Sequence, residues 1–177
     1  MRKLFIVPIV LLTILASCKK DNSTALPIGT IVATIDGVVD TFNVNDSAVI
    51  EYTPYVDPSP YRAVFAAGGS ESSSDPSNDI VLIIASIPQS IKTGTYSDST
   101  GSYEAAILYQ HNADDVTYQT THSPYNSTIN ITSMSSSSVQ GTFSGQLMLA
   151  PGNISSITTH TITNGKFNLP LAYFYLP

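Results

Sequence analysis

The chain has 177 residues, a formal net charge of −6, a charged fraction of 11% and a single cysteine. From Thr24 onward three basic residues face twelve acidic ones, a balance of −9 that excludes an electrostatic footprint for nucleic acid or anionic lipid headgroups. The abundance of Ser, Thr, β-branched residues and tyrosines, without a sustained apolar period of 3.6, favours strands over amphipathic helices.

The first eighteen residues have the pattern of an exported, lipid-anchored protein. Arg2 and Lys3 precede an apolar run, Leu4 to Leu15, that is too short to cross a hydrocarbon layer of roughly 30 Å as a stable helix. Such a run is typical of a cleaved secretory segment. The tail Leu15-Ala16-Ser17-Cys18 resembles a bacterial lipobox, in which the cysteine receives a diacylglycerol and becomes the first residue after cleavage.

Cys18 is therefore the expected lipidation site and the means of membrane attachment. Two or three acyl chains anchor a protein lastingly, because each buried methylene contributes about 0.8 kcal/mol. Lys19, rather than Asp, follows the cysteine, which favours the outer membrane; the sequence leaves open whether the domain faces the periplasm or the cell surface. We expect a signal peptide over residues 1–17, the lipidated cysteine and a tether over 18–27, and one domain over 28–177.

The first predicted element of that domain is a hairpin. Thr30–Ile35 and Val38–Phe42 flank Asp36-Gly37, a pair whose residues can both adopt positive φ in a two-residue turn. Ile35 then lies opposite Val38. This register predicts one shared apolar face made of Ile31, Ala33, Ile35, Val38 and Phe42.

Further strands follow at nearly regular spacing. Residues 80–87 are apolar on both faces, which predicts a central strand covered on both sides. Asn164-Gly165 predicts a second two-residue turn that pairs Ile162 with Phe167 and His160 with Leu169. Pro170 indicates that the last strand lies at a sheet edge. About nine short strands predict an all-β fold, an antiparallel β-sandwich, with an eight-stranded β-barrel as the alternative.

Four short motifs carry a family resemblance. Ala33-Thr-Ile-Asp-Gly37, Gly94-Thr-Tyr96, Gly141-Thr-Phe143 and Ile162-Thr-Asn-Gly-Lys-Phe167, in this order behind a lipobox, resemble a group of bacterial lipoproteins of unknown function. Members of that group carry a single β-rich domain. The resemblance spans most of the mature chain and implies the fold, but it brings no catalytic or binding residues with it.

No motif predicts catalysis or a cofactor. The spacing of His111, His122 and His160 matches no metal motif, and the turn register would place His160 beside Ile162 as a structural histidine. The chain has no Gly-x-Ser-x-Gly elbow. Candidate calcium ligands are three side chains of one polar loop, those of Asp75, Asn78 and Asp79.

Binding is the expected function. Tyr52, Tyr55 and Tyr61 surround a proline-rich corner and are candidates for stacking on a sugar or docking a protein. We therefore expect a non-catalytic interaction or binding module of the cell envelope, with another envelope protein or a glycan as partner. The alternatives are a carbohydrate-binding accessory lipoprotein and an envelope hydrolase.

Overall fold

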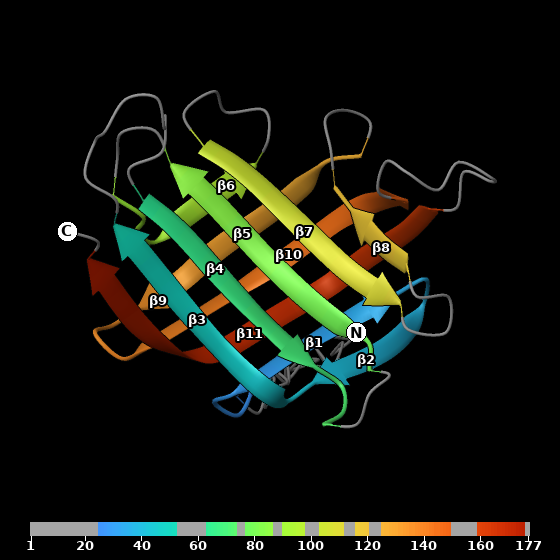
Figure 1. Cartoon of the computed structure of the whole chain (residues 1–177), viewed down its shortest axis with the longest axis horizontal. Helices are drawn as coiled ribbons and strands as arrows, with labels where there is room; N and C mark the ends of the chain where they lie inside the picture. Colours follow the sequence, from blue (N-terminus) through green and yellow to red (C-terminus); the bar gives the residue numbers. More distant parts are fainter. Residues whose placement is uncertain are drawn as a thin grey trace, which may run out of the picture.

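The computed structural model describes residues 25–52, 63–73, 77–86, 90–97, 103–111, 116–120, 125–149 and 159–175, in which every helix-or-strand element is a strand (Figure 1). Within these ranges no helix has the length and apolar character needed to cross a membrane. The strands are β1 (Thr30–Ile35), β2 (Val38–Phe42), β3 (Val44–Tyr52), β4 (Ala63–Ser70), β5 (Asp79–Ser86), β6 (Gly94–Ser97), β7 (Tyr103–His111), β8 (Val116–Gln119), β9 (Ser127–Met134), β10 (Ser138–Leu149) and β11 (Thr159–Tyr175).

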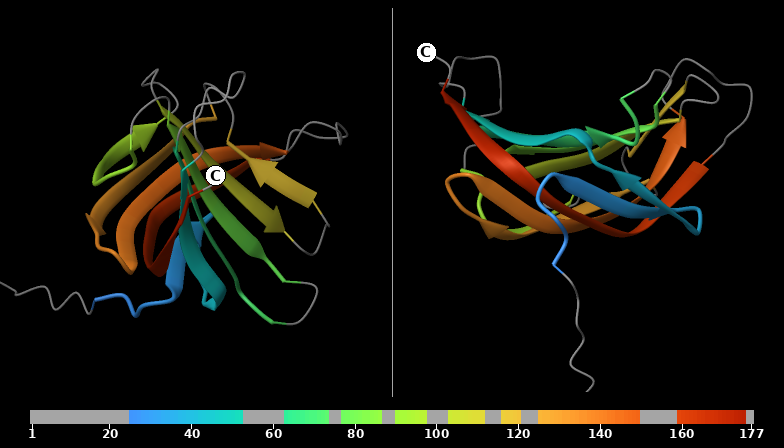
Figure 2. Two further views of the ribbon diagram at one scale, coloured as in Figure 1. Left: turned by 60° about the vertical axis from the view of Figure 1, so that its left-hand side comes forward. Right: turned by 90° about the horizontal axis from the view of Figure 1, so that it is seen from below.

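All these strands belong to one sheet that curls into a ring. Their order is β2-β1-β11-β3-β4-β5-β7-β8-β10-β9-β6, and a further pairing between β10 and β11 closes the ring. Neighbouring strands are antiparallel except for β11 and β3, which run parallel. In Figures 1 and 2, β3, β4, β5 and β7 form one layer that crosses a second layer of β9, β10, β11 and β1. The predicted all-β fold of the sandwich and barrel type is confirmed.

The interior is filled by the inward side chains of both layers. Phe65 from one layer and Phe143 from the other both pack against Phe167, with ring centroids 6.2 Å and 6.4 Å apart. Alternate residues along each strand are buried, as the period of two requires. The fully buried large side chains are Phe42, Phe65, Phe167, Ile31, Ile50, Ile80, Leu82, Ile84, Ile107, Ile129, Ile131 and Leu147.

The hairpin predicted at Asp36-Gly37 is confirmed. Asp36 and Gly37 have φ of 50° and 87°, and Ile35 pairs with Val38. The predicted apolar face is wrong at Val38, whose exposed fraction is 64%, because among the described strands β2 pairs only with β1 and lies at the edge of the sheet. The other four residues of that face are buried.

The turn predicted at Asn164-Gly165 is wrong, because these residues lie inside the continuous strand β11. Asn164 has the predicted positive φ of 52°, but it lies at a bulge in the pairing with β10 rather than at a reversal of the chain. Ile162 pairs with Gly145 and Phe167 pairs with Gly141. Positive φ serves a bulge and a turn equally, so the dipeptide alone does not distinguish them.

Pro170 also lies away from a sheet edge, contrary to the prediction. On one side β11 pairs with β10 over most of its length. On the other side it pairs with β1 up to Asn168 and with β3 from Leu171 onward. Pro170 lies between the segment that pairs with β1 and the segment that pairs with β3. Its lack of an amide hydrogen therefore removes no hydrogen bond from either pairing.

Candidate interaction face

The outward side of β5 is the first sign of a functional surface. Its inward residues Ile80, Leu82 and Ile84 are fully buried, but outward Val81 is 36% exposed and Ile83 is half-buried. The prediction that other parts of the protein cover both sides of this strand is therefore wrong for the outer side. The remaining described strands all lie beside β5 in the sheet or on its inner side (Figure 1).

The register of β3, β4, β5 and β7 extends this apolar surface sideways. Val49 pairs with Ala66, Ala66 with Ile83, and Ile83 with Ala106, which gives one apolar row across four strands. A second row adds Gly68, Val81 and Leu108, and a third adds Val64 and Ala85. We call this surface the outer face and define it by Val49, Val64, Ala66, Gly68, Val81, Ile83, Ala85, Ala106 and Leu108.

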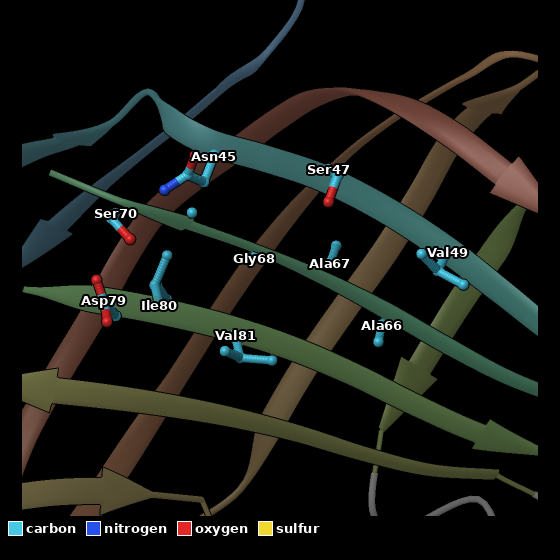
Figure 3. Close-up of a pocket in the computed structure, with 11 residues that line it drawn as sticks. Asn45, Ser47, Val49, Ala66, Ala67, Gly68, Ser70, Asp79, Ile80 and Val81 are labelled. Atoms are coloured by element: carbon cyan, nitrogen blue, oxygen red, sulfur yellow. The ribbon is translucent and has the colours of Figure 1, made fainter. Parts of the chain in front are cut away.

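The outer face is hollowed along β4. Ala66 and Gly68 present little or no side chain between Val49 on β3 and Val81 on β5, and the hollow has a volume of about 320 Å³ (Figure 3). A Cβ on Gly68 would lie 3.0 Å from the Ile80 carbonyl oxygen, so the glycine also allows close packing of the strands. The hollow could receive an apolar side chain of a partner.

One end of the hollow is polar. Asn45, Ser70 and Asp79 gather there, whereas Val49 and Ala66 lie at the other end (Figure 3). The Oδ1 atom of Asp79 is buried and accepts no hydrogen bond from any described residue. A buried carboxylate oxygen without a donor is unfavourable, which makes this end a place where a ligand's donor would be stabilised.

A second buried carboxyl lies behind the same end of the sheet, at a bulge in β3. The pairing of β3 with β4 shifts between Val44 and Ser47, and Asn45 takes a positive φ of 57°. The Asp46 side chain then occupies the space that a side chain on Gly69 would need. Burial raises the pKa of Asp46 to about 7; the Ser70 backbone opposes this shift, but its geometry falls short of a hydrogen bond.

A third polar cluster joins the β1–β2 hairpin to the rest of the sheet. His160 Nδ1 lies 2.5 Å from Asp36 Oδ2, and the Thr161 amide donates to Asp36 Oδ1 at 2.8 Å. Burial alone would raise the pKa of Asp36, but the hydrogen bonds from Thr161 and His160 outweigh it, so the pKa is lowered. The Tyr118 ring packs edge to face on His160 with centroids 4.2 Å apart. His160 therefore joins the hairpin to β11, but its Nε2 is buried and has no hydrogen-bond partner among the described residues, so the expected structural histidine is only partly satisfied. The register that was expected to place it is wrong.

The same cluster continues toward β7. The His111 and His160 rings are 6.2 Å apart, and both lie about 6 Å from the Tyr109 ring. Burial raises the pKa of Asp40 and Glu71, and the Asp40 charge adds to the shift of Glu71. Burial and these carboxylates also raise the pKa of Tyr109. Across the residues that the structure describes, no three His, Cys, Asp or Glu side chains are arranged to hold a metal ion.

The candidate residues from the sequence are only partly placed. Asn78 donates to Glu71 Oε2 at 2.9 Å while Asp79 lines the hollow, so the structure gives these two calcium candidates different surroundings. Tyr52 ends β3, opposite Ala63. The predictions for Cys18, Tyr55, Tyr61, Asp75 and His122 concern residues outside the described ranges.

Sequence reasoning missed the outer face, although its signal was present. A strand with apolar residues on both sides is expected to have another layer packed on each side. In the part of the chain that the structure describes, β5 has such a layer only on its inner side. The buried position of Asp46 had no sequence signal, because nothing in Val44-Asn-Asp-Ser47 marks a bulge.

Comparison with protein-family models finds no match for the chain, and the searches of curated proteins and of solved structures find none either.

Proposed function

We propose that the chain is a lipoprotein of the outer membrane, anchored through lipid on Cys18, whose β domain is a non-catalytic module that docks another envelope protein. The outer face carries this proposal. Large contiguous apolar patches, above a few hundred Å², are rare on monomeric soluble proteins and commonly mark recognition sites. Here nine small or apolar residues of four strands face outward together; Val81 is exposed, Ala85 is buried and the others are half-buried.

The position of the N-terminal segment supports a protein rather than the membrane as occupant. Asn168 on β11 donates to the Leu26 carbonyl at 2.6 Å, and its own carbonyl accepts from Gly29 at 2.7 Å. The segment therefore enters the domain on the β1–β11 layer, opposite the outer face (Figure 2). The seven residues 18–24 span at most about 25 Å when extended. Such a short tether holds the β1–β11 side toward the membrane and leaves the outer face available.

Photo-crosslinking in intact cells tests the docking face. A benzoylphenylalanine in place of Val81 should give a discrete protein adduct, whereas the same residue in place of Thr142, exposed on the other layer, should not. Adding Ala66→Arg fills the hollow and should abolish the adduct without unfolding the domain. Three results would overturn the proposal: no adduct from position 81, an adduct to lipid, or an adduct that survives Ala66→Arg.

Anchoring and location need separate tests. Incorporation of labelled palmitate should disappear in Cys18→Ser, and the domain should then leave the membrane fraction. Antibody labelling of a C-terminal tag on intact and permeabilised cells distinguishes the cell surface from the periplasm. Retention of label in Cys18→Ser would contradict the assigned acceptor.

The carbohydrate-binding alternative depends on Tyr52, Tyr55 and Tyr61, and the structure adds nothing to it in the ranges it describes. A glycan at a hundred times its Kd would stabilise the domain by about 2.7 kcal/mol. An increase in melting temperature with one member of a glycan panel would favour this alternative over a protein partner.

A further inference from the structure

Resting on the proposed function, we infer the chemistry of the partner: it presents an apolar side chain to the hollow and a lysine or arginine to Asp79. The occupant of the outer face is then a basic protein segment, rather than a second copy of this chain or an anionic lipid surface.

Asp79 supplies the first argument. It opens β5 opposite Ser70 on β4 and Gln110 on β7, on the outward side of the sheet and at the polar end of the hollow (Figure 3). Its buried Oδ1 receives no hydrogen bond from the described residues. Because Oδ1 itself is buried, a partner's cation would meet Asp79 where the side chain lines the hollow, and hydrogen bonds between charged groups are about twice as strong as neutral ones.

The charge around the outer face supplies the second argument. Glu51 lies on the outward side of β3, one row beyond Val49, so carboxyls stand at both ends of the apolar rows. The two lysines among the described residues lie elsewhere: Lys166 is on β11, and Lys92 precedes β6. A basic partner complements this surface and would associate faster at low salt.

The same charges argue against a second copy of the chain. In a two-fold symmetric dimer the same patch faces itself, so the acidic ends of the two outer faces would meet each other. Like charges brought together at an interface are unfavourable. An anionic membrane surface would be repelled for the same reason.

Strand geometry sets the spacing that the partner needs. Gly68, at the floor of the hollow, and Ser70, opposite Asp79, are two residues apart on β4, or about 7 Å. In an extended segment, residues i and i+2 point to the same side at the same spacing. A segment with an apolar residue at i and a lysine or arginine at i+2 would therefore reach the hollow and Asp79 together.

Two labelled peptides test the inference on the purified full chain. Both contain the sequence Val-Thr-Val-Thr-Z, in which the two valines and Z point to the same side. Z is lysine in one peptide and glutamate in the other. We expect fluorescence anisotropy at low salt to show that the lysine peptide binds at least about tenfold more tightly. Asp79→Asn should remove most of that preference, whereas the charge-matched control Asp21→Asn, in the tether, should keep it.

The inferred partner chemistry would be overturned by any of three results: equal binding of the two peptides, binding of neither, or a lysine preference that persists in Asp79→Asn. The Val81 crosslink does not depend on charge, so an adduct together with equal peptide binding would retain the docking face and reject the basic partner. An adduct between two copies of the chain would reject the inference as well.

Discussion

Asp46→Asn should stabilise the protein at alkaline pH. The Asp46 carboxyl is enclosed at the β3 bulge, and neither of its oxygens accepts a hydrogen bond from the described residues. Its pKa rises from 3.8 to about 7, and each unit corresponds to about 1.36 kcal/mol, so the ceiling on the effect is about 4 kcal/mol. Because the residue is only half-buried, solvent screening reduces the expected gain to about 1–2 kcal/mol.

The pH dependence follows from the direction of that shift. Between pH 3.8 and about 7 the folded state holds a proton on Asp46 that the unfolded state has lost. The stability contributed by Asp46 is therefore complete below 3.8, decreases as pH rises through 7, and is lost above it. The neutral amide of Asp46→Asn lacks this loss, so the variant gains most at pH 8 and little at pH 4.

Urea unfolding of both proteins at pH 4, 6 and 8 measures this difference, since the midpoint shifts at constant slope when only stability changes. Glu51→Gln is the matched control, because Glu51 is a carboxyl on the outward side of the same strand. A gain from Asp46→Asn that is equal at pH 4 and pH 8, or no gain at pH 8, would refute the reasoning.

Three further predictions concern packing and hydrogen bonding. Gly69→Ala places a Cβ against the Asp46 carboxyl and should lower stability by about 1–3 kcal/mol in thermal melts; Asp46→Ala in the same chain should restore it. Asp36→Ala removes two hydrogen bonds to β11 and should reduce the free energy of unfolding by about 1 kcal/mol at pH 7; the difference should decrease as pH falls below the lowered pKa, towards the pH-independent cost of alanine at positive φ, and a difference that does not change with pH would contradict this. A Cβ in Gly141→Ala would clash with the Asn130 carbonyl oxygen and the Phe167 ring and should prevent soluble expression, whereas Gly145→Ala, with its nearest atoms at 3.1–3.2 Å, should fold; equal yields would argue against the packing.

The two Asx-Gly pairs show how far local sequence reasoning reaches. Asp36-Gly37 is a turn and Asn164-Gly165 is a bulge, although both first residues adopt similar positive φ. Local chemistry predicts that conformation correctly in both places. The difference is tertiary, because β11 pairs with β10 on one side and with β1 on the other at Asn164 and continues between them.

The candidate site was predictable only in part. The apolar residues on both sides of β5 could be read from the sequence, but the exposure of Val81 depends on which layer covers the strand. The alignment of Ala66 with Ile83 requires the register between two strands, which a single sequence does not supply. Asp79 was predicted as an oxygen ligand of a loop, whereas it begins a strand and faces the hollow.

The position of β11 has a consequence for the order of folding. Thr159–Tyr175 is the last strand in sequence, yet it lies between β10, β1 and β3 and joins the N-terminal strands to the rest of the ring. During synthesis, β1 and β3 cannot pair with β11 until it has been made, more than a hundred residues later. Contacts of such long range form slowly. Until that strand emerges the chain has no closed structure. For the exported lipoprotein proposed above, this delay would be useful, because the chain would cross the membrane before the ring closes.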